Sequence, residues 1–228
     1  LAALKGELIA SVQALPHEPL FGSETIVKMA AAVLEGGAKA LRIQSTDDIK
    51  AVKQAFPNVP VIGLIKQDYS DSEIFITPTS KEVKAIIDAG ADMIALDMTG
   101  RTRPSGETID DLIGQIRQSS CTIMADIATF EQGVKAQKLG VDCVSTTLSG
   151  YTPDTAHSGD TPDFALIRRL SQALTIPVIA EGRVSTPNHV SQAMAAGAWT
   201  VVVCSAITRP QLITQKFVSA IQAEKELA

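Results

Sequence analysis

Residues 60–66, Pro-Val-Ile-Gly-Leu-Ile-Lys, form an apolar run that a proline precedes and a lysine ends. Apolar side chains follow one another here without polar alternation, which is typical of a strand buried on both faces of a parallel sheet. The proline suits the position just ahead of a strand, because its missing N–H costs little there. Residues 199–203, Trp-Thr-Val-Val-Val, have the same character. The sequence therefore predicts a parallel sheet covered by helices.

Eight such runs occur along the chain, and segments with apolar residues at helical spacing separate them. The predicted strands span residues 8–14, 40–43, 61–66, 93–97, 122–127, 143–148, 178–181 and 200–205. A weak internal period supports this count, since a glycine closes the helix before every second strand, at intervals of 50 to 57 residues. These glycines are Gly37, Gly90, Gly140 and Gly197.

Eight βα units in 228 residues predict an α/β fold, a compact TIM (β/α)8 barrel. A doubly wound open sheet uses the same alternation, but it usually has fewer strands and a glycine-rich first turn. No such turn follows Ala14. Because no long linker divides the chain, we expect one domain over residues 1–228.

Composition excludes several classes of partner. The formal charge of -5 and the lack of a basic run argue against a nucleic-acid surface. The longest apolar run, residues 29–34, is far shorter than a membrane span, and we expect a cytoplasmic protein. The three cysteines have no metal-ligand spacing, so we expect buried free thiols and no metal site. They are Cys121, Cys143 and Cys204.

Polar residues gather where the predicted strands end. In a TIM barrel, active sites lie at the carboxyl ends of the strands, so these side chains face one cleft. They are Gln13, Arg42, Lys66, Asp97, Asp126 and Glu181. An exposed charge or a salt bridge explains any one of them equally well. Six that converge predict a catalytic site.

Lys66 and Glu181 suit proton transfer. Burial after an apolar run lowers the pKa of a lysine, and a neutral lysine can remove a proton or form a Schiff base. The pKa of Glu181 would be raised by apolar neighbours or lowered by Arg183, and the sequence leaves both open. Gly182, Arg183 and Ser205 follow the last two strands, where many barrels bind phosphate. Arg209 lies just before the final helix, which Pro210 begins, and is either close to that anion or a solvated charge.

Longer motifs add a resemblance that covers about residues 6–217. They are residues 11–15 with 18–20, 61–66, 75–79 with 81–83, 94–97, 103–104, 124–127, 146–152, 179–183 and 205–210. In these stretches the chain resembles the N-acetylmannosamine-6-phosphate 2-epimerases of bacterial sialic acid breakdown. The resemblance implies a cofactor-free, metal-free TIM barrel that inverts C2 of an amino-sugar phosphate, and a homo-oligomer, since relatives are often dimers. The last helix, residues 211–221, is the candidate surface.

Carried over to this chain, the resemblance makes Lys66 and Glu181 the catalytic residues. Whether Lys66 acts alone or shares the proton transfer with Glu181 stays open. The resemblance also makes a set of neighbouring residues bind the sugar and its phosphate. They are Gln13, Arg42, Asp126, Gly182, Arg183, Ser205 and Arg209.

Two positions depart from the family pattern. Val12 replaces a usual Cys, a conservative change, and Cys204 replaces a usual Gly. If that position needs a positive φ or lets the phosphate approach the backbone closely, the Cβ of Cys204 weakens phosphate binding. Two other functions remain open, a Schiff-base aldolase acting through Lys66 and a non-catalytic phosphosugar-binding module. We assign no role to His17, His157 and His189.

Overall fold

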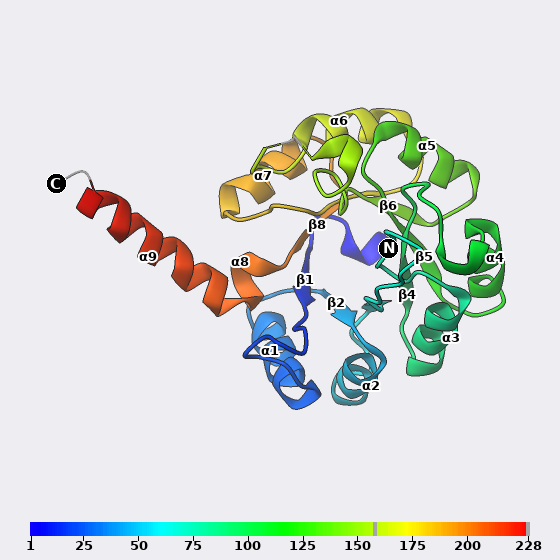
Figure 1. Cartoon of the computed structure of the whole chain (residues 1–228), viewed down its shortest axis with the longest axis horizontal. Coiled ribbons are helices and arrows are strands. Elements are labelled where there is room, and N and C mark those ends of the chain that lie inside the picture. The colour runs from blue at the N-terminus through cyan, green and yellow to red at the C-terminus, as the bar shows by residue number, and fades with distance from the viewer. Residues whose placement is uncertain (157–158, 227–228) are drawn as a thin grey trace.

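The computed structural model describes residues 1–156 and 159–226, which leaves His157 outside the described residues. The chain forms a closed barrel of eight parallel strands in sequence order, with β8 pairing back to β1 (Figure 1). This confirms the predicted TIM barrel. The strands are β1 (Leu8–Val12), β2 (Ala40–Gln44), β3 (Val61–Leu64), β4 (Met93–Asp97), β5 (Thr122–Asp126), β6 (Cys143–Ser145), β7 (Val178–Ala180) and β8 (Thr200–Val203).

Six of the predicted strands are one to three residues too long at their carboxyl ends. After β6, for example, Leu148 stays buried, yet the N–H of Ser149 donates to the carbonyl of Thr146 three residues earlier, at 3.1 Å. The chain thus turns out of the ladder while its side chains still fill the mouth of the barrel. Apolar character therefore overestimates strand length at this end.

Helices surround the barrel and connect the strands (Figure 1). Most begin at a Ser, Thr or Asp whose side chain accepts a hydrogen bond from the first helical turn, and α3, α4 and α5 have complete capping boxes. They are α1 (Ser23–Glu35), α2 (Thr46–Ala55), α3 (Ser80–Ala89), α4 (Ile109–Ile116), α5 (Phe130–Lys138), α6 (Phe164–Ala173), α7 (Pro187–Ala195), α8 (Ser205–Thr208) and α9 (Pro210–Glu226). Short 3-10 helices span Ala2–Leu4, Pro104–Gly106 and Pro153–Thr155.

The glycines that mark the internal period all have positive φ, between 78° and 105°, as a helix C-terminus requires. Gly63 has a different reason to be glycine. A Cβ there would lie 2.7 Å from Ile86 Cγ2 and 2.9 Å from Ala91 Cβ, because α3 packs directly on β3. The missing side chain allows this close contact.

Side chains alternate in direction along each strand, so they pack into two separate cores. One face of each strand packs against the helices, and the other points into the barrel, where Ile9, Ile62, Met124 and Ile179 lie together. Every second residue after these also points inward. The polar side chains at the carboxyl ends therefore meet inside the mouth of the barrel.

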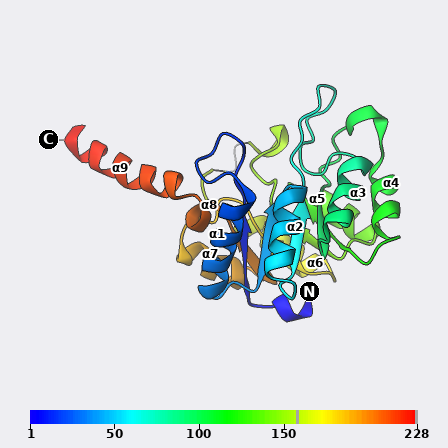
Figure 2. The same ribbon diagram turned by 90° about the horizontal axis from the view of Figure 1, so that it is seen from below.

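The last helix departs from this plan. Figures 1 and 2 show α9 projecting away from the barrel, beyond the single turn of α8. The helix begins at Pro210, as expected, but runs to Glu226, five residues past the predicted end. Phe217 is 70% exposed on it, and Val218 and Ile221 are also exposed. In the described part of the chain, no helix has both the length and the hydropathy to cross a bilayer.

The cysteines differ from one another. Cys143 is buried inside the barrel, as predicted, whereas Cys121 and Cys204 are only partly buried. Their prediction as buried thiols was wrong because Cys121 precedes β5 and Cys204 follows β8, where the chain enters and leaves the barrel wall.

Candidate active site

A charged cluster of one arginine and two carboxyls lies inside the mouth of the barrel. Arg42 comes from β2, Asp126 from β5, and Glu181 follows β7. Arg42 binds Asp126 with both terminal nitrogens, Nη1 to Oδ1 at 3.0 Å and Nη2 to Oδ2 at 2.6 Å. Its Nη1 also lies 3.1 Å from Glu181 Oε2. Arg42 is 1% exposed and Asp126 is fully buried, so these charges interact with little screening.

Burial and charge shift the pKa values of this cluster. Burial raises the pKa of Glu181; Arg42 opposes that effect and Asp126 adds to it. Burial alone would lower the pKa of Arg42, but the two carboxylates outweigh it and keep the guanidinium charged. The cluster therefore holds a permanent cation beside a carboxyl that favours its proton.

Lys66 lies two residues beyond β3, where its backbone pairs with Ile76 in an isolated antiparallel bridge. Burial lowers the pKa of this lysine, and the nearby cations Arg42 and Arg209 lower it further. Cys204 and Glu181 act in the opposite direction. Within the described part of the chain, Lys66 Nζ forms no hydrogen bond or ion pair. A lysine of lowered pKa without a partner suits a general base.

Gln13 and Arg209 lie on the first-strand side of the site. Gln13 donates from Nε2 to Ser11 Oγ at 2.7 Å, and its Oε1 is buried without a hydrogen-bond partner among the described residues. Arg209 Nη2 lies 2.9 Å from Glu18 Oε2. Glu18 also accepts from the backbone N–H of Leu15 at 2.8 Å, so it holds Arg209 beside the β1 loop.

The proposed phosphate side has unusual backbone geometry. Gly182 and Arg183 have φ values of 99° and 58°, both in the left-handed region. Arg183 Nη1 donates to the carbonyl of Gly159 at 3.0 Å, and its guanidinium lies 6.0 Å from the ring centre of Tyr151. Ser205 is the first residue of α8 and is partly buried.

Comparison with known proteins shows which family this chain is similar to. A family model described as "Putative N-acetylmannosamine-6-phosphate epimerase" matches residues 26–223. This chain belongs to that family. A relative with the same description in Clostridioides difficile (strain 630) is 50% identical over 222 residues, 97% of this chain and 99% of the relative. Another relative, in Enterobacter sp. (strain 638), is 50% identical over 226 residues, which cover 98% of this chain and 96% of the relative.

A solved structure supports the same assignment. It comes from a "structural and biochemical characterization of the N-acetylmannosamine-6-phosphate 2-epimerase from Clostridium perfringens". It is 48% identical, covers 95% of this chain and 94% of its own, and superposes with a TM-score of 0.93.

Cys204 fits this member of the epimerase family without backbone strain. Its φ is -117°, so the position does not use the left-handed conformation that would require glycine. The condition of a positive φ is therefore not met, and the effect of the Cβ on a phosphate that approaches the backbone stays a prediction. The side chain lies close to Lys66 and Arg42, on whose pKa values it acts.

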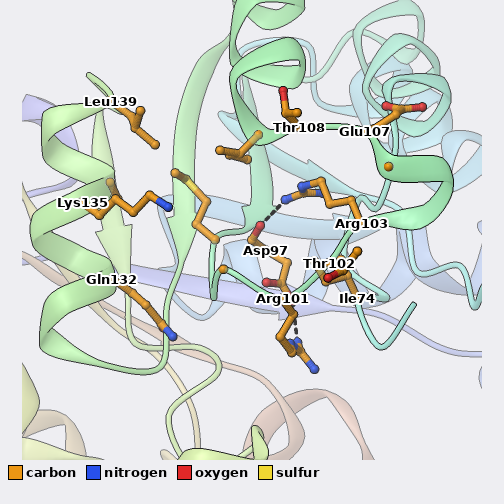
Figure 3. A pocket seen from close by; sticks show the side chains of 15 residues that line it. Ile74, Asp97, Arg101, Thr102, Arg103, Glu107, Thr108, Gln132, Lys135 and Leu139 are labelled. Carbon is orange, nitrogen blue, oxygen red and sulfur yellow. Dashed lines mark hydrogen bonds and ion pairs between the residues drawn. The ribbon is translucent and has the colours of Figure 1, made fainter. Parts of the chain in front are cut away.

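Asp97 does not join the charged cluster. Its Oδ2 lies 2.7 Å from Arg101 Nη2, its Oδ1 accepts from Thr99, and Arg103 donates to its backbone carbonyl (Figure 3). Asp97, Arg101 and Arg103 line a pocket of about 230 Å³ beside α5, into which Lys135 points (Figure 3). Of the six side chains predicted to converge, Arg42, Asp126 and Glu181 form the cluster, and Lys66 lies beside it. Gln13 instead contacts Ser11, and Asp97 pairs with Arg101.

Sequence reasoning missed two kinds of residue in this epimerase site. Glu18 holds Arg209, although it belongs to a quoted motif and received no role. Thr147 contacts both carboxyls of the cluster and Ser145 contacts Glu181, but neither carries a charge, so charge at the strand ends does not reveal them. Their inward alternation at the end of β6 was the available signal.

Proposed function

We propose that this chain interconverts N-acetylmannosamine 6-phosphate and N-acetylglucosamine 6-phosphate by removing the proton at C2 and returning one to the opposite face. The observation that carries the proposal is the pair of Lys66 and Glu181 at the same barrel mouth. Lys66 has no partner among the described residues and a lowered pKa, whereas the pKa of Glu181 is raised. Opposite shifts of this kind assign a base and an acid.

The proposed chemistry gives each group a step. The C2–H bond is acidic only beside the C1 aldehyde, so the reacting sugar is ring-opened. Lys66 takes the C2 proton, the electron pair moves toward O1 as an enolate, and Glu181 supplies a proton to C2 from the other face. In the reverse direction the two residues exchange roles.

Arg42 supports this reaction indirectly. Both of its terminal nitrogens bind carboxyl oxygens, so its role is to hold Asp126 and Glu181 and to balance the negative charge of the pair. A direct hydrogen bond from these nitrogens to O1 would break those contacts. Asp126 in turn keeps Arg42 in place, and both are supporting residues.

The phosphorylated sugar requires cations and N–H donors away from C2. We assign the phosphate to Arg209, Arg183 and the backbone around Gly182 and Ser205. A sugar hydroxyl is assigned to Gln13 Oε1, which has no hydrogen-bond partner in the described part of the chain. Arg209 is held by Glu18, and its Nε likewise has no partner among the residues that the structure describes. The two cations lie on loops after β7 and β8, where barrels commonly bind phosphate.

Proton NMR in deuterium oxide tests the function. Wild-type protein with N-acetylmannosamine 6-phosphate should form the gluco epimer, with deuterium entering C2. Lys66→Ala should abolish both signals, and Glu181→Gln should reduce turnover by about 100-fold or more. Borohydride added with substrate should leave no covalent adduct on Lys66. A folded wild-type protein that shows neither conversion nor C2 exchange would refute the assignment.

We further propose a homodimer in which the exposed apolar face of α9 packs on a second copy of the chain. Phe217, Val218 and Ile221 support this, since apolar side chains on a projecting helix favour burial. Light scattering should give twice the chain mass for the wild type. Phe217→Asp should shift it to the monomer mass, whereas Lys216→Asp on the same helix should not.

The resemblance also suggests where the enzyme acts. We propose a cytoplasmic role in sialic acid breakdown, and possession of the gene should restore growth on sialic acid to a bacterium that lacks its own epimerase. The Lys66→Ala variant is the matched control.

A further inference from the structure

The pocket beside α5 lies outside the charged cluster of the barrel mouth. Its walls come from the loop between β4 and α4, the start of α4 and one face of α5 (Figure 3). Among the described residues, none that we assign to the epimerase reaction, to the sugar or to the phosphate lines it. A ligand in this pocket would therefore leave the proposed phosphosugar site free.

The size of the pocket suits a small organic molecule. Its volume is about 230 Å³, and the exposed residues Thr102, Thr108 and Lys135 at its edge leave it open to solvent. An apolar cavity of about 150 Å³ holds benzene, which has about six heavy atoms. In the same proportion, this pocket takes a molecule of about nine heavy atoms.

Part of the lining is apolar. Ile74, Met98 and Ala136 are buried, and Ile109 and Leu139 are half-buried. An apolar body that covers these side chains removes their remaining surface from water, which favours binding. A bare inorganic ion cannot use this part of the wall. The ligand therefore needs an apolar portion.

The two carboxylates of the pocket already have partners. Asp97 pairs with Arg101 and accepts from Thr99, and its side chain is fully buried. Glu107 accepts from the backbone N–H of Ser80 through Oε2 at 2.7 Å and from Ser80 Oγ through Oε1 at 3.1 Å. Neither carboxylate can turn to another cation without losing these bonds.

Lys135 is the cation that these pairs leave over. It lies in the last turn of α5 and points into the pocket (Figure 3). In the part of the chain that the structure describes, no carboxylate lies within ion-pair distance of its Nζ, Glu131 one turn earlier included. An anionic ligand would gain a charge-assisted hydrogen bond from this ammonium.

The remaining walls are held in place before any ligand binds. Arg103 is 5% exposed, and its Nη1 donates to the carbonyls of Thr77 and Pro78 at 3.1 Å and 2.8 Å. From α5, Gln132 Nε2 donates to the carbonyl of Thr99 at 2.8 Å and so ties the helix to the loop. A pocket with fixed walls binds without the cost of ordering them.

We propose that this pocket is a second binding site, for a small monocarboxylate with a compact apolar body. The carboxylate lies on Lys135, and the body packs against the side chains of Met98, Ile109 and Leu139. One negative charge suffices, because Lys135 is one cation and Asp97 and Glu107 repel a second charge. Benzoate is the probe, since it has about nine heavy atoms and one carboxylate.

Amide NMR signals of the full chain test the site. Benzoate should shift those of Gly100 and Gly106, which line the pocket, with a Kd of about 1 mM. Lys135→Met keeps the side-chain stem and removes the charge, so it should weaken binding about fivefold, whereas Lys135→Arg should bind as the wild type does. Lys138→Met is the matched control, because Lys138 is also exposed in the last turn of α5 and should leave the Kd unchanged.

Two comparisons need only the wild type, so they decide even if a variant fails to fold. Benzamide has the same shape without the charge and should bind about fivefold more weakly. Saturating N-acetylmannosamine 6-phosphate should leave the benzoate Kd unchanged. The readout requires no turnover, so an inactive protein that binds benzoate in this way refutes the proposed function and leaves the site standing.

Three results overturn the site. The first is the absence of shifts at Gly100 and Gly106 at about ten times the expected Kd. The second is equal binding of benzoate and benzamide, which would remove the role of the charge. The third is displacement of benzoate by the phosphosugar together with loss of binding in Arg209→Ala, which would place the probe in the proposed phosphate site instead.

Discussion

Replacing Arg42 by Met should destabilise the barrel in a pH-dependent way. The substitution keeps much of the apolar stem and removes a guanidinium that makes three contacts of 2.6 to 3.1 Å with Asp126 and Glu181. Two carboxyls then face each other, one with a fully buried side chain and one with a side chain 10% exposed. Breaking a buried pair by removing one partner costs about 3–5 kcal/mol, and we expect that cost in the free energy of unfolding at pH 8.

The cost should shrink in acid. Burial raises the pKa of Glu181 and Arg42 opposes that rise, so without Arg42 the native variant binds more protons than the unfolded state. Its stability therefore falls as pH rises, by up to about 1.4 kcal/mol per pH unit for each extra proton bound. Protonation in acid removes the unpaired negative charge from the variant, so the deficit against the wild type should be smaller at pH 5 than at pH 8.

Urea unfolding followed by circular dichroism, at about pH 5, 6.5 and 8, measures this difference. A double variant, Arg42→Met with Asp126→Asn, is the matched control because it removes one of the opposed charges. It should recover part of the loss at pH 8 and show a flatter pH dependence. A deficit under about 1 kcal/mol at pH 8, or one of equal size at pH 5 and pH 8, would contradict the buried-cluster reasoning.

Three further predictions concern other parts of the molecule. Lys66→Met should raise the free energy of unfolding at pH 7 by about 0.5–2 kcal/mol. Because the folded pKa of Lys66 is lowered, the native lysine opposes protonation, and the gain should vanish above the unfolded pKa in urea titrations at high pH. Glu18→Gln should raise KM for the phosphosugar by about threefold to tenfold with little change in kcat, since Arg209 loses its anchor; steady-state kinetics checks this against Glu24→Gln, whose exposed pair with Lys28 has no role. Gly63→Val should cost about 1–3 kcal/mol in thermal or urea unfolding, because its Cβ would overlap Ile86.

The fold could be predicted because the strands carry redundant signals. Continuous apolar runs, the prolines before Val61 and Val178, and the periodic glycines all indicate the same eight units. Where β6 ends could not be predicted, since the backbone turns at Thr146 while Leu148 remains buried. Hydropathy reports burial, and burial continues past the ladder in the mouth of a barrel.

The charged residues of the site could be predicted from the sequence, because they stand at the ends of apolar strands. Arg42, Asp126 and Glu181 were expected to converge, and they form one cluster. Asp97 ends its strand in the same way, yet it pairs with Arg101 four residues later, a local contact that strand position alone does not predict. Alternation at the end of β6 points Ser145 and Thr147 inward, but Ser and Thr are common, and only the geometry shows which carboxyl each hydroxyl contacts.

Burial shifts the pKa values of Lys66 and Glu181 in opposite directions, and both shifts have the same physical cause. A low-polarity site disfavours charge, so it lowers the pKa of the lysine and raises that of the carboxyl, and both approach neutrality. A neutral amine accepts a proton and a neutral acid donates one, which is the pair that inversion at C2 needs. Arg42 and Asp126 cancel each other's charge beside them. The cations assigned to the phosphate, Arg183 and Arg209, follow β7 and β8 on separate loops, so the substrate's charge is met away from the groups that must stay neutral.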